Sequence, residues 1–123
     1  MQFGSIDNLV VWKKALSLAK SVYMLSKDFP SDEKFGLCDQ MRRAAVSISS
    51  NIAEGHGRMT DKEFLHFLSI ANGSLYELES QLLLSIEIYP HLGERCKELL
   101  TKISEEKRLI RSLVHSLRTR ISH

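Results

Sequence analysis

The sequence predicts an all-α protein, an antiparallel up-down-up-down four-helix bundle formed by one domain over residues 1–123. The chain contains only 2 prolines and 6 glycines, too few breakers for a turn-rich β sandwich or barrel. Apolar residues recur at spacings of three and four along segments of about 20 to 29 residues. Links of a few residues join these segments, and such short links favour antiparallel neighbours. A composition of 43% apolar and 26% charged residues fits a folded globular chain.

The first predicted helix covers residues 8–28, because Asp7 or Asn8 can cap its start and Phe29-Pro30 stops it. Two apolar stripes run along it: Leu9, Trp12, Leu16, Ala19 and Tyr23, and Val11, Ala15, Leu18, Val22, Leu25 and Phe29. An apolar arc this wide exceeds what one core-facing surface helix needs. We therefore expect this helix either to be central in the bundle or to serve a subunit interface as well.

The second predicted helix covers residues 32–54, with Ser31 as its N-terminal cap and Gly55 at its end. Its apolar stripe comprises Leu37, Met41, Ala44, Ile48 and Ile52. A polar stripe on another face comprises Gln40, Arg43, Ser47, Asn51 and Glu54. We expect Arg43 to join a structural network with Glu54 or Glu77, in which Asn51 also takes part, because arginine on a bundle helix usually pairs with a carboxylate.

The third predicted helix covers residues 60–88 and starts with the capping-box pair Thr60 and Glu63. Gly73 inside it costs roughly 1 kcal/mol relative to alanine, which predicts a close approach of another helix there. The fourth predicted helix covers residues 91–119. Its apolar heptad-like stripe has one acidic member and comprises Leu92, Cys96, Leu99, Ile103, Glu106, Ile110, Leu113, Leu117 and Ile121.

The candidate metal ligands do not form a recognisable site. A di-iron bundle needs Glu-x-x-His pairs from two helices, and the chain offers a single pair, Glu63 and His66. Glu63 is also the expected capping-box partner. Cys38 and Cys96 lack cysteine or histidine neighbours at zinc-ligand spacing, so we expect buried, reduced thiols. We expect no metal and no cofactor.

Catalytic arrangements are equally weak, and we predict no catalytic residue. Arg111 and His115 lie one helical turn apart, as a metal-independent ribonuclease could use, yet such pairs are common by chance in basic helices. The glycine-rich segment 55–58 precedes a helix start and could bind an anion. Its spacing matches no phosphate-binding loop, and acidic residues follow it directly.

Positive charge is concentrated near the end of the sequence, although the net charge is only +2. The basic residues from position 107 onward, without any acidic residue among them, are Lys107, Arg108, Arg111, Arg118 and Arg120. Such cations can simply stabilise the negative pole of a helix dipole, or they can contact a polyanion. We take these five, followed by Arg42 and Arg58, as candidate nucleic-acid contacts. Few exposed aromatic residues are expected, which argues against sequence-specific recognition of single strands.

Two motifs resemble a known bacterial family. Residues 40–58, QMRRAAVSISSNIAEGHGR, and 64–82, FLHFLSIANGSLYELESQL, resemble the signature of the 23S rRNA intervening-sequence proteins. That family is itself similar to the accessory variability proteins of diversity-generating retroelements. The opening LVVWKKALSLAKSVYMLSKDFP fits the same family, and Ser49 departs from it where many members carry proline. The resemblance implies a homopentameric ring, no known catalytic activity, and association with RNA, DNA or a nucleic-acid-processing protein.

The sequence therefore suggests a non-enzymatic homo-oligomeric module that binds RNA or DNA through phosphate contacts from basic residues. The alternative is a protein-interaction scaffold or an accessory subunit for a nucleic-acid enzyme, and a cryptic ribonuclease is a third hypothesis. The start of the chain lacks a signal-peptide pattern, and no apolar stretch approaches the roughly 20 residues that span a bilayer. We expect a cytoplasmic protein with no membrane partner.

Overall fold

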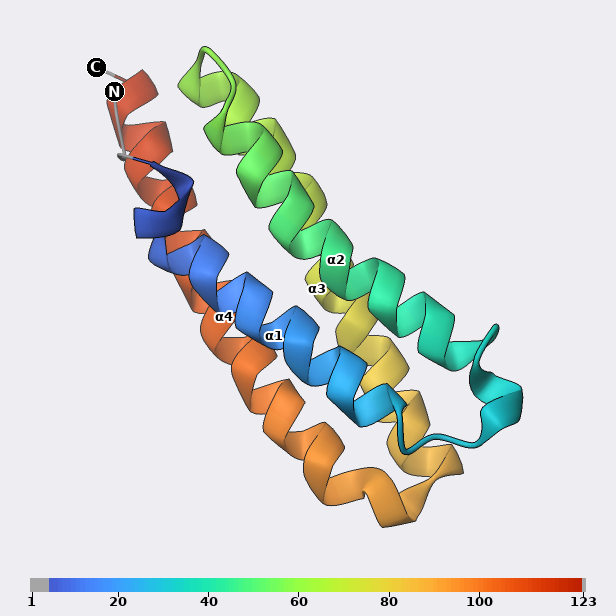
Figure 1. Ribbon diagram of the computed structural model, residues 1–123. Coiled ribbons are helices and arrows are strands. Elements are labelled where there is room, and N and C mark those ends of the chain that lie inside the picture. The colour runs from blue at the N-terminus through green and yellow to red at the C-terminus, as the bar shows by residue number, and fades with distance from the viewer. Residues whose placement is uncertain (1–4, 123) are drawn as a thin grey trace.

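The computed structural model describes residues 5–122, which form four long α-helices without a β-strand (Figure 1). Residues 1–4 and 123 of the expected domain lie outside this described part. The long helices are α1 (Val10–Ser26), α2 (Leu37–His56), α3 (Asp61–Ile88) and α4 (Gly93–Ile121). Short 3₁₀ turns occupy Ile6–Asn8, Ser31–Glu33 and Pro90–Leu92. None of the described helices is both long enough and apolar enough to cross a membrane.

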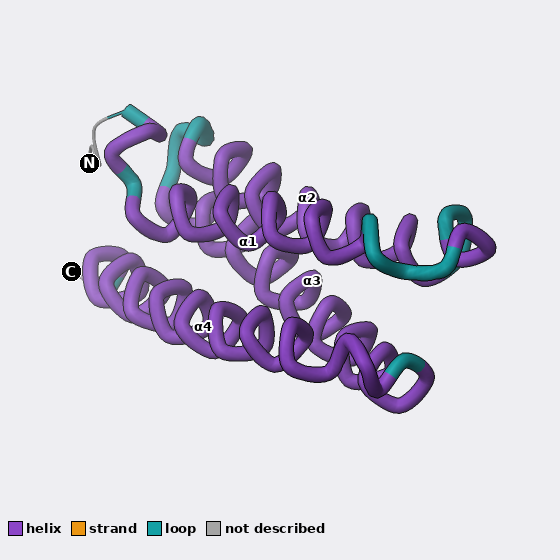
Figure 2. The backbone as a smooth tube through the Cα atoms, turned by 60° about the horizontal axis from the view of Figure 1, so that its bottom comes forward, coloured by secondary structure: helices purple, strands orange, loops and turns teal. Residues whose placement is uncertain are grey.

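The four helices pack around one shared core. Both α1 and α3 pack along α2 and α4, so every helix has two close neighbours. Figure 1 places the α2/α3 link, the start of α1 and the end of α4 at one end of the molecule, and the other two links at the opposite end. Figure 2 shows the links as short loops at the ends of long helical rods.

The core is built from the predicted apolar stripes. Its fully buried members include Leu18, Met41, Ile48, Leu75, Leu82 and Ile103. On α1, the stripe through Val11, Leu18 and Val22 is buried. The other α1 stripe is only half covered, with Leu16 at 43% and Tyr23 at 44% exposure. Because α1 is not central but packs on two neighbours like every other helix, its wide apolar arc leaves an exposed remainder.

The start of α1 differs from the prediction. Its N-cap is Leu9, and no side chain caps it. Asp7 and Asn8 lie inside the preceding 3₁₀ turn, where the Leu9 amide donates to the Ile6 carbonyl at 3.0 Å. The short turn therefore uses the residues that were expected to cap the helix. The helix itself ends at Ser26, and single 3₁₀-type hydrogen bonds continue to Phe29.

Helix α2 starts five residues later than the predicted range 32–54, at Leu37. Ser31 lies in a 3₁₀ turn and caps nothing. Gly36, with φ −107° and ψ −112°, separates that turn from the helix. The Leu37 amide instead donates to Glu33 Oε1 at 3.2 Å. A glutamate from the turn therefore takes the place that the sequence suggested for serine.

Gly55 does not end α2, which continues to His56 with Gly57 as its C-cap. A Cβ atom on Gly55 would lie 2.8 Å from Phe64 Cδ1 and 2.8 Å from Phe67 Cβ. Such distances are shorter than carbon atoms tolerate, so only glycine lets α2 approach the first turns of α3 this closely. Glycine is needed at this position for helix packing rather than for a stop.

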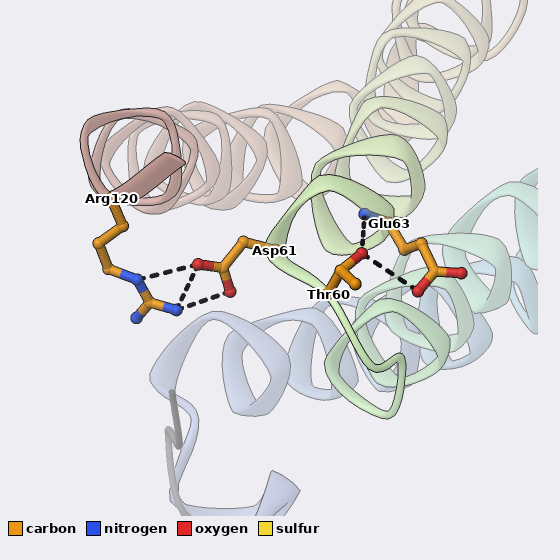
Figure 3. Close-up of polar contacts among 4 residues, drawn as sticks. All are labelled: Thr60, Asp61, Glu63 and Arg120. Carbon is orange, nitrogen blue, oxygen red and sulfur yellow. Dashed lines mark hydrogen bonds and ion pairs between the residues drawn. The ribbon is translucent and has the colours of Figure 1, made fainter. Parts of the chain in front are cut away.

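The capping box at the start of α3 is confirmed, and the interpretation of Gly73 is wrong. Thr60 Oγ1 accepts a hydrogen bond from the Glu63 amide at 3.1 Å, and the two side chains also interact at 3.2 Å (Figure 3). A Cβ atom on Gly73 would meet nothing within 4 Å, so no helix approaches it. Helix α4 begins and ends two residues later than the predicted range 91–119, because Pro90–Leu92 forms a 3₁₀ turn.

Candidate nucleic-acid interface

A groove of about 250 Å³ lies between α3 and α4 and gathers several of the predicted basic residues. Its polar and aromatic lining comprises Ser69, Asn72 and Tyr76 from α3 and Lys107, Arg111 and Arg118 from α4. Residues four and seven positions apart share one face of an α-helix, which explains why these three cations lie together. Arg108 is exposed on the same helix but does not line the groove.

Lys107 is not a free cation of this groove. Its Nζ lies 3.0 Å from Glu79 Oε2 and 3.8 Å from the centre of the Tyr76 ring. Its side chain is only 13% exposed. The carboxylate compensates the lysine charge, and the ammonium group holds the tyrosine ring by a cation–π contact. Lys107 therefore organises the α3 wall of the groove rather than offering a charge to a ligand.

Arg111 and Arg118 supply the uncompensated charge. Both are exposed, and neither forms an ion pair within residues 5–122. A guanidinium group presents a planar fork of donors that matches two phosphate oxygens. Two such guanidinium groups lie along one groove. Of the surfaces formed by the predicted basic residues, this groove is therefore the most suitable for a polyanion.

Arg120 has a different role. Its guanidinium forms a forked contact with Asp61, at 2.6 Å to Oδ1 and 3.0 Å to Oδ2 (Figure 3). The two side chains are 31% and 27% exposed. This pair ties the last turn of α4 to the first turn of α3 at the end of the bundle. Its charge is already neutralised by an internal partner.

Arg42 and Arg58 do not join the groove either. Arg42 Nε donates to Ser26 Oγ at 3.0 Å, and its guanidinium lies over the Tyr23 ring on α1. Arg58 lies past the end of α2, where it pairs with Glu54 at 3.1 Å and covers the Phe67 ring. The structure thus assigns both arginines to contacts between neighbouring elements.

The predicted network around Arg43 is wrong. Arg43 Nε bonds to Asp39 Oδ2 at 3.0 Å, one turn earlier on the same helix. Glu54 pairs with Arg58 instead, and Glu77 is exposed. The polar stripe of α2 does not bring Arg43 to Glu54 because eleven residues separate them along one straight helix. A neighbour one turn away is reached more easily than either predicted partner.

Asn51 belongs to a smaller network that links α2 to α3. Its Nδ2 donates to the Ser47 carbonyl at 2.8 Å and lies 3.0 Å from Ser47 Oγ. Ser47 Oγ in turn shares a hydrogen bond with Ser74 Oγ at 2.8 Å. Sequence reasoning did not assign Ser74 to this network, because α3 carries other serines and the contact depends on how α2 packs beside it. The network satisfies polar groups between the packed helices α2 and α3.

The two cysteines and the histidine of the candidate metal ligands lie in separate surroundings. Cys38 and Cys96 are buried free thiols, as expected, and burial raises the pKa of each. His66 lies edge-on to the Phe67 ring at 5.3 Å. Within residues 5–122, no three His, Cys, Asp or Glu side chains gather closely enough to hold a metal ion.

Glu106 is the polar residue that sequence analysis left without a role. It occupies the core stripe of α4 at 1% exposure, and neither carboxyl oxygen has a hydrogen-bond partner in the described chain. Desolvation and, to a lesser extent, the negative charge of Glu105 raise its pKa, Lys14 partly opposes them, and together they bring the pKa to about 8. Its carboxyl group is therefore largely protonated at neutral pH.

The four-helix core and the groove between α3 and α4 define an all-α bundle protein with a candidate polyanion-binding surface. Residues 7–112 match the model of the 23S rRNA-intervening sequence protein family, and the chain belongs to this family. A crystal structure from Bacteroides thetaiotaomicron VPI-5482, a protein with unknown function from the S23 ribosomal protein family, is similar to it with 27% identity and a TM-score of 0.79. That similarity covers 86% of this chain and 96% of the other. No curated protein matches the chain.

Proposed function

We propose that this protein is a non-enzymatic, homo-oligomeric module of the cytoplasm that binds nucleic acid through the groove between α3 and α4. Its up-down-up-down bundles would assemble into a ring, which the family resemblance suggests has five copies. The observation that carries the proposal is the presence of two unpaired arginines, Arg111 and Arg118, in one groove with polar side chains opposite them.

A single groove with phosphate contacts of this kind binds weakly, and several linked grooves bind one ligand more tightly. Two arginines release few counterions from one nucleic-acid strand, so one subunit would bind weakly at physiological salt. A ring repeats the groove in every subunit, and linked sites bind one long ligand far more tightly than each site alone. The family name refers to intervening sequences of 23S rRNA, which supports structured RNA as the first ligand to test.

We expect affinity for a structured RNA to fall steeply as salt rises. Arg111→Ala and Arg118→Ala should each weaken binding and flatten the plot of log affinity against log salt, by about 0.7 to 0.9 for each phosphate that is no longer neutralised. Fluorescence anisotropy with a labelled RNA hairpin, measured between about 50 and 200 mM salt, gives both quantities. Arg108→Ala is the matched control, because it removes the same charge from the same helix outside the groove.

Several results would contradict the proposal. Absence of binding at low salt, or affinity that does not change with salt, removes the electrostatic mechanism. An equal weakening in Arg108→Ala would place binding outside the groove. Cleavage of the RNA by the wild-type protein but not by His115→Ala would favour a ribonuclease. Capture of a protein partner that survives nuclease treatment, without RNA binding, would favour the scaffold or accessory-subunit alternative.

The half-exposed stripe of α1 supports the oligomeric part of the proposal. Leu16 and Tyr23 remain 43% and 44% exposed within one subunit, next to partly covered Trp12. Light scattering should report a multiple of the 14.1 kDa subunit mass at micromolar concentration. Leu16→Glu should shift the particle towards the monomer, because it places a charge in the apolar contact. Leu84→Glu, at a leucine of similar exposure on α3, should not. A monomeric wild-type protein would rule out the assembly.

A further inference from the structure

Tyr76 is an exposed aromatic residue that does not fill the core. It lies on the α3 wall of the groove and is 53% exposed. Lys107 Nζ contacts the ring, and Glu79 holds that lysine by an ion pair at 3.0 Å. A ring that is already held in position loses little conformational freedom when another flat group stacks on it. Lys107 therefore covers one face of the ring, and the exposed remainder of Tyr76 lines the groove in a fixed orientation.

Asn72 lies one helical turn before Tyr76 and lines the same groove. Its amide makes no side-chain hydrogen bond within the described residues. An amide offers a donor and an acceptor side by side, which is the pattern needed to pair with the edge of a nucleobase. Phosphate, in contrast, offers only acceptors. The α3 wall thus carries groups suited to a base, whereas the α4 wall carries groups suited to phosphates.

The two free arginines fit a strand better than a small anion. Arg111 and Arg118 are separated by two helical turns, about 10.5 Å along the axis of α4. Lys107 contacts Tyr76, so both arginines lie on the same side of the ring, towards the end of α4. A strand that runs along α4 would place one base at Tyr76 and successive phosphates at the arginines.

The size of the groove favours an unpaired base. Its volume of about 250 Å³ fits a group of the size of one base and its sugar, whereas a duplex could only lie across its mouth. Bases inside a duplex are stacked and paired, and an A-form helix does not present their faces to side chains. Bases in loops, bulges and ends are free to stack on an aromatic ring.

We infer that the groove between α3 and α4 receives an unpaired nucleotide of RNA, with its base stacked on Tyr76 and paired to Asn72 and its phosphates at Arg111 and Arg118. This inference rests on the proposed function, because it identifies the ligand of the same groove. The sequence predicted few exposed aromatic residues and so argued against recognition of single strands, and the exposed Tyr76 ring is the reason to revise that argument. Lys107 and Glu79 act as positioning residues for the ring.

Two RNA hairpins of equal length, one fully paired and one with an internal loop of unpaired bases, test the inference by fluorescence anisotropy. The wild-type protein should bind the looped hairpin more tightly. Tyr76→Ala should weaken binding of the looped hairpin roughly 5- to 100-fold, the effect of removing one stacking interaction, and should change binding of the paired hairpin less than about twofold. Tyr76→Phe keeps the ring and should bind almost as the wild type does.

Phe35→Ala is the matched control for this experiment. Phe35 is 86% exposed and has Lys34 Nζ over its ring at 5.4 Å, yet it lies outside both the groove and the α1 stripe. This variant should leave the preference for the looped hairpin unchanged. If the wild type binds both hairpins equally and Tyr76→Ala weakens neither, the inference is wrong, while weaker binding in Arg111→Ala alone would still support phosphate binding. If the wild-type protein binds neither hairpin, both the inference and the proposed function are wrong.

Discussion

Glu106→Leu is expected to stabilise the protein, and the gain should grow as pH rises from about 5 to 8. Leucine has a similar size, fits the apolar stripe between Ile103 and Ile110, and carries no buried polar atom without a partner. The wild-type glutamate, in contrast, must stay protonated in the folded protein or bring a charge into the core. Removal of this conflict is the largest single stabilisation that the structure suggests.

The sign of the pH dependence follows from the two pKa values. Burial raises the pKa of Glu106 from 4.5 to about 8 in the folded protein. Between these values the folded state holds a proton that the unfolded state has released, so the free energy of unfolding falls as pH rises. The decrease is about 1.4 kcal/mol per pH unit and reaches up to about 5 kcal/mol near pH 8. The contribution is fully present below pH 4.5 and absent above pH 8.

Urea unfolding of the wild type and Glu106→Leu at several pH values between 4.5 and 9 measures this effect. Glu98→Leu is the matched control, because Glu98 is exposed on the same helix. The control should keep the wild-type pH dependence, and Glu106→Leu should lose most of it. Wild-type stability that stays constant from pH 5 to 8 would show that the Glu106 carboxyl is solvated or paired in solution.

Gly55→Ala is expected to destabilise the protein by roughly 1 to 3 kcal/mol, although alanine favours helices. The added Cβ would lie 2.8 Å from Phe67 Cβ, an atom close to the backbone that cannot swing aside. Helix α2 must then move away from α3, which opens the packing beside their link. Thermal and denaturant unfolding measure the change in stability.

Gly73→Ala is the control, and it should change stability in the opposite direction. Its new Cβ meets nothing within 4 Å, so only the helix propensity acts, and stability should rise by about 1 kcal/mol. Helix propensity predicts the same gain in stability at both glycines. A loss of stability in Gly55→Ala and a gain in Gly73→Ala would therefore isolate the effect of the close approach at Gly55. A gain in both variants would show that α2 and α3 are farther apart there than the structure indicates.

Much of the helical framework could be predicted because it depends on local rules. The Thr60 capping box satisfies its own helix start, and heptad-like spacing places residues such as Leu75 and Ile103 on core faces whatever their neighbours are. Helix starts were less predictable where two local solutions compete. At α2, both Ser31 and Glu33 can cap a helix, and the position of Gly36 decided in favour of Glu33.

The candidate site was only half predictable. The basic residues of α4 stand out in the sequence, but their roles depend on α3. Arg120 meets Asp61, and Lys107 meets Glu79 and Tyr76, whereas Arg111 meets no acid within residues 5–122. No spacing rule within one helix contains that information, because each partner comes from a different helix. Tyr76 was missed for the same reason, since its exposure depends on how α4 packs beside it.

The sequence alone determined the helices, their apolar faces and membership in the 23S rRNA-intervening sequence protein family, because periodicity, capping and motif are properties of contiguous residues. Only the tertiary structure decided which glycine is essential for packing, which arginines are neutralised and which remain free for a ligand. Those outcomes depend on distances between atoms of different helices. Such distances are set when the helices pack against one another, and the spacing of residues along one helix does not reveal them.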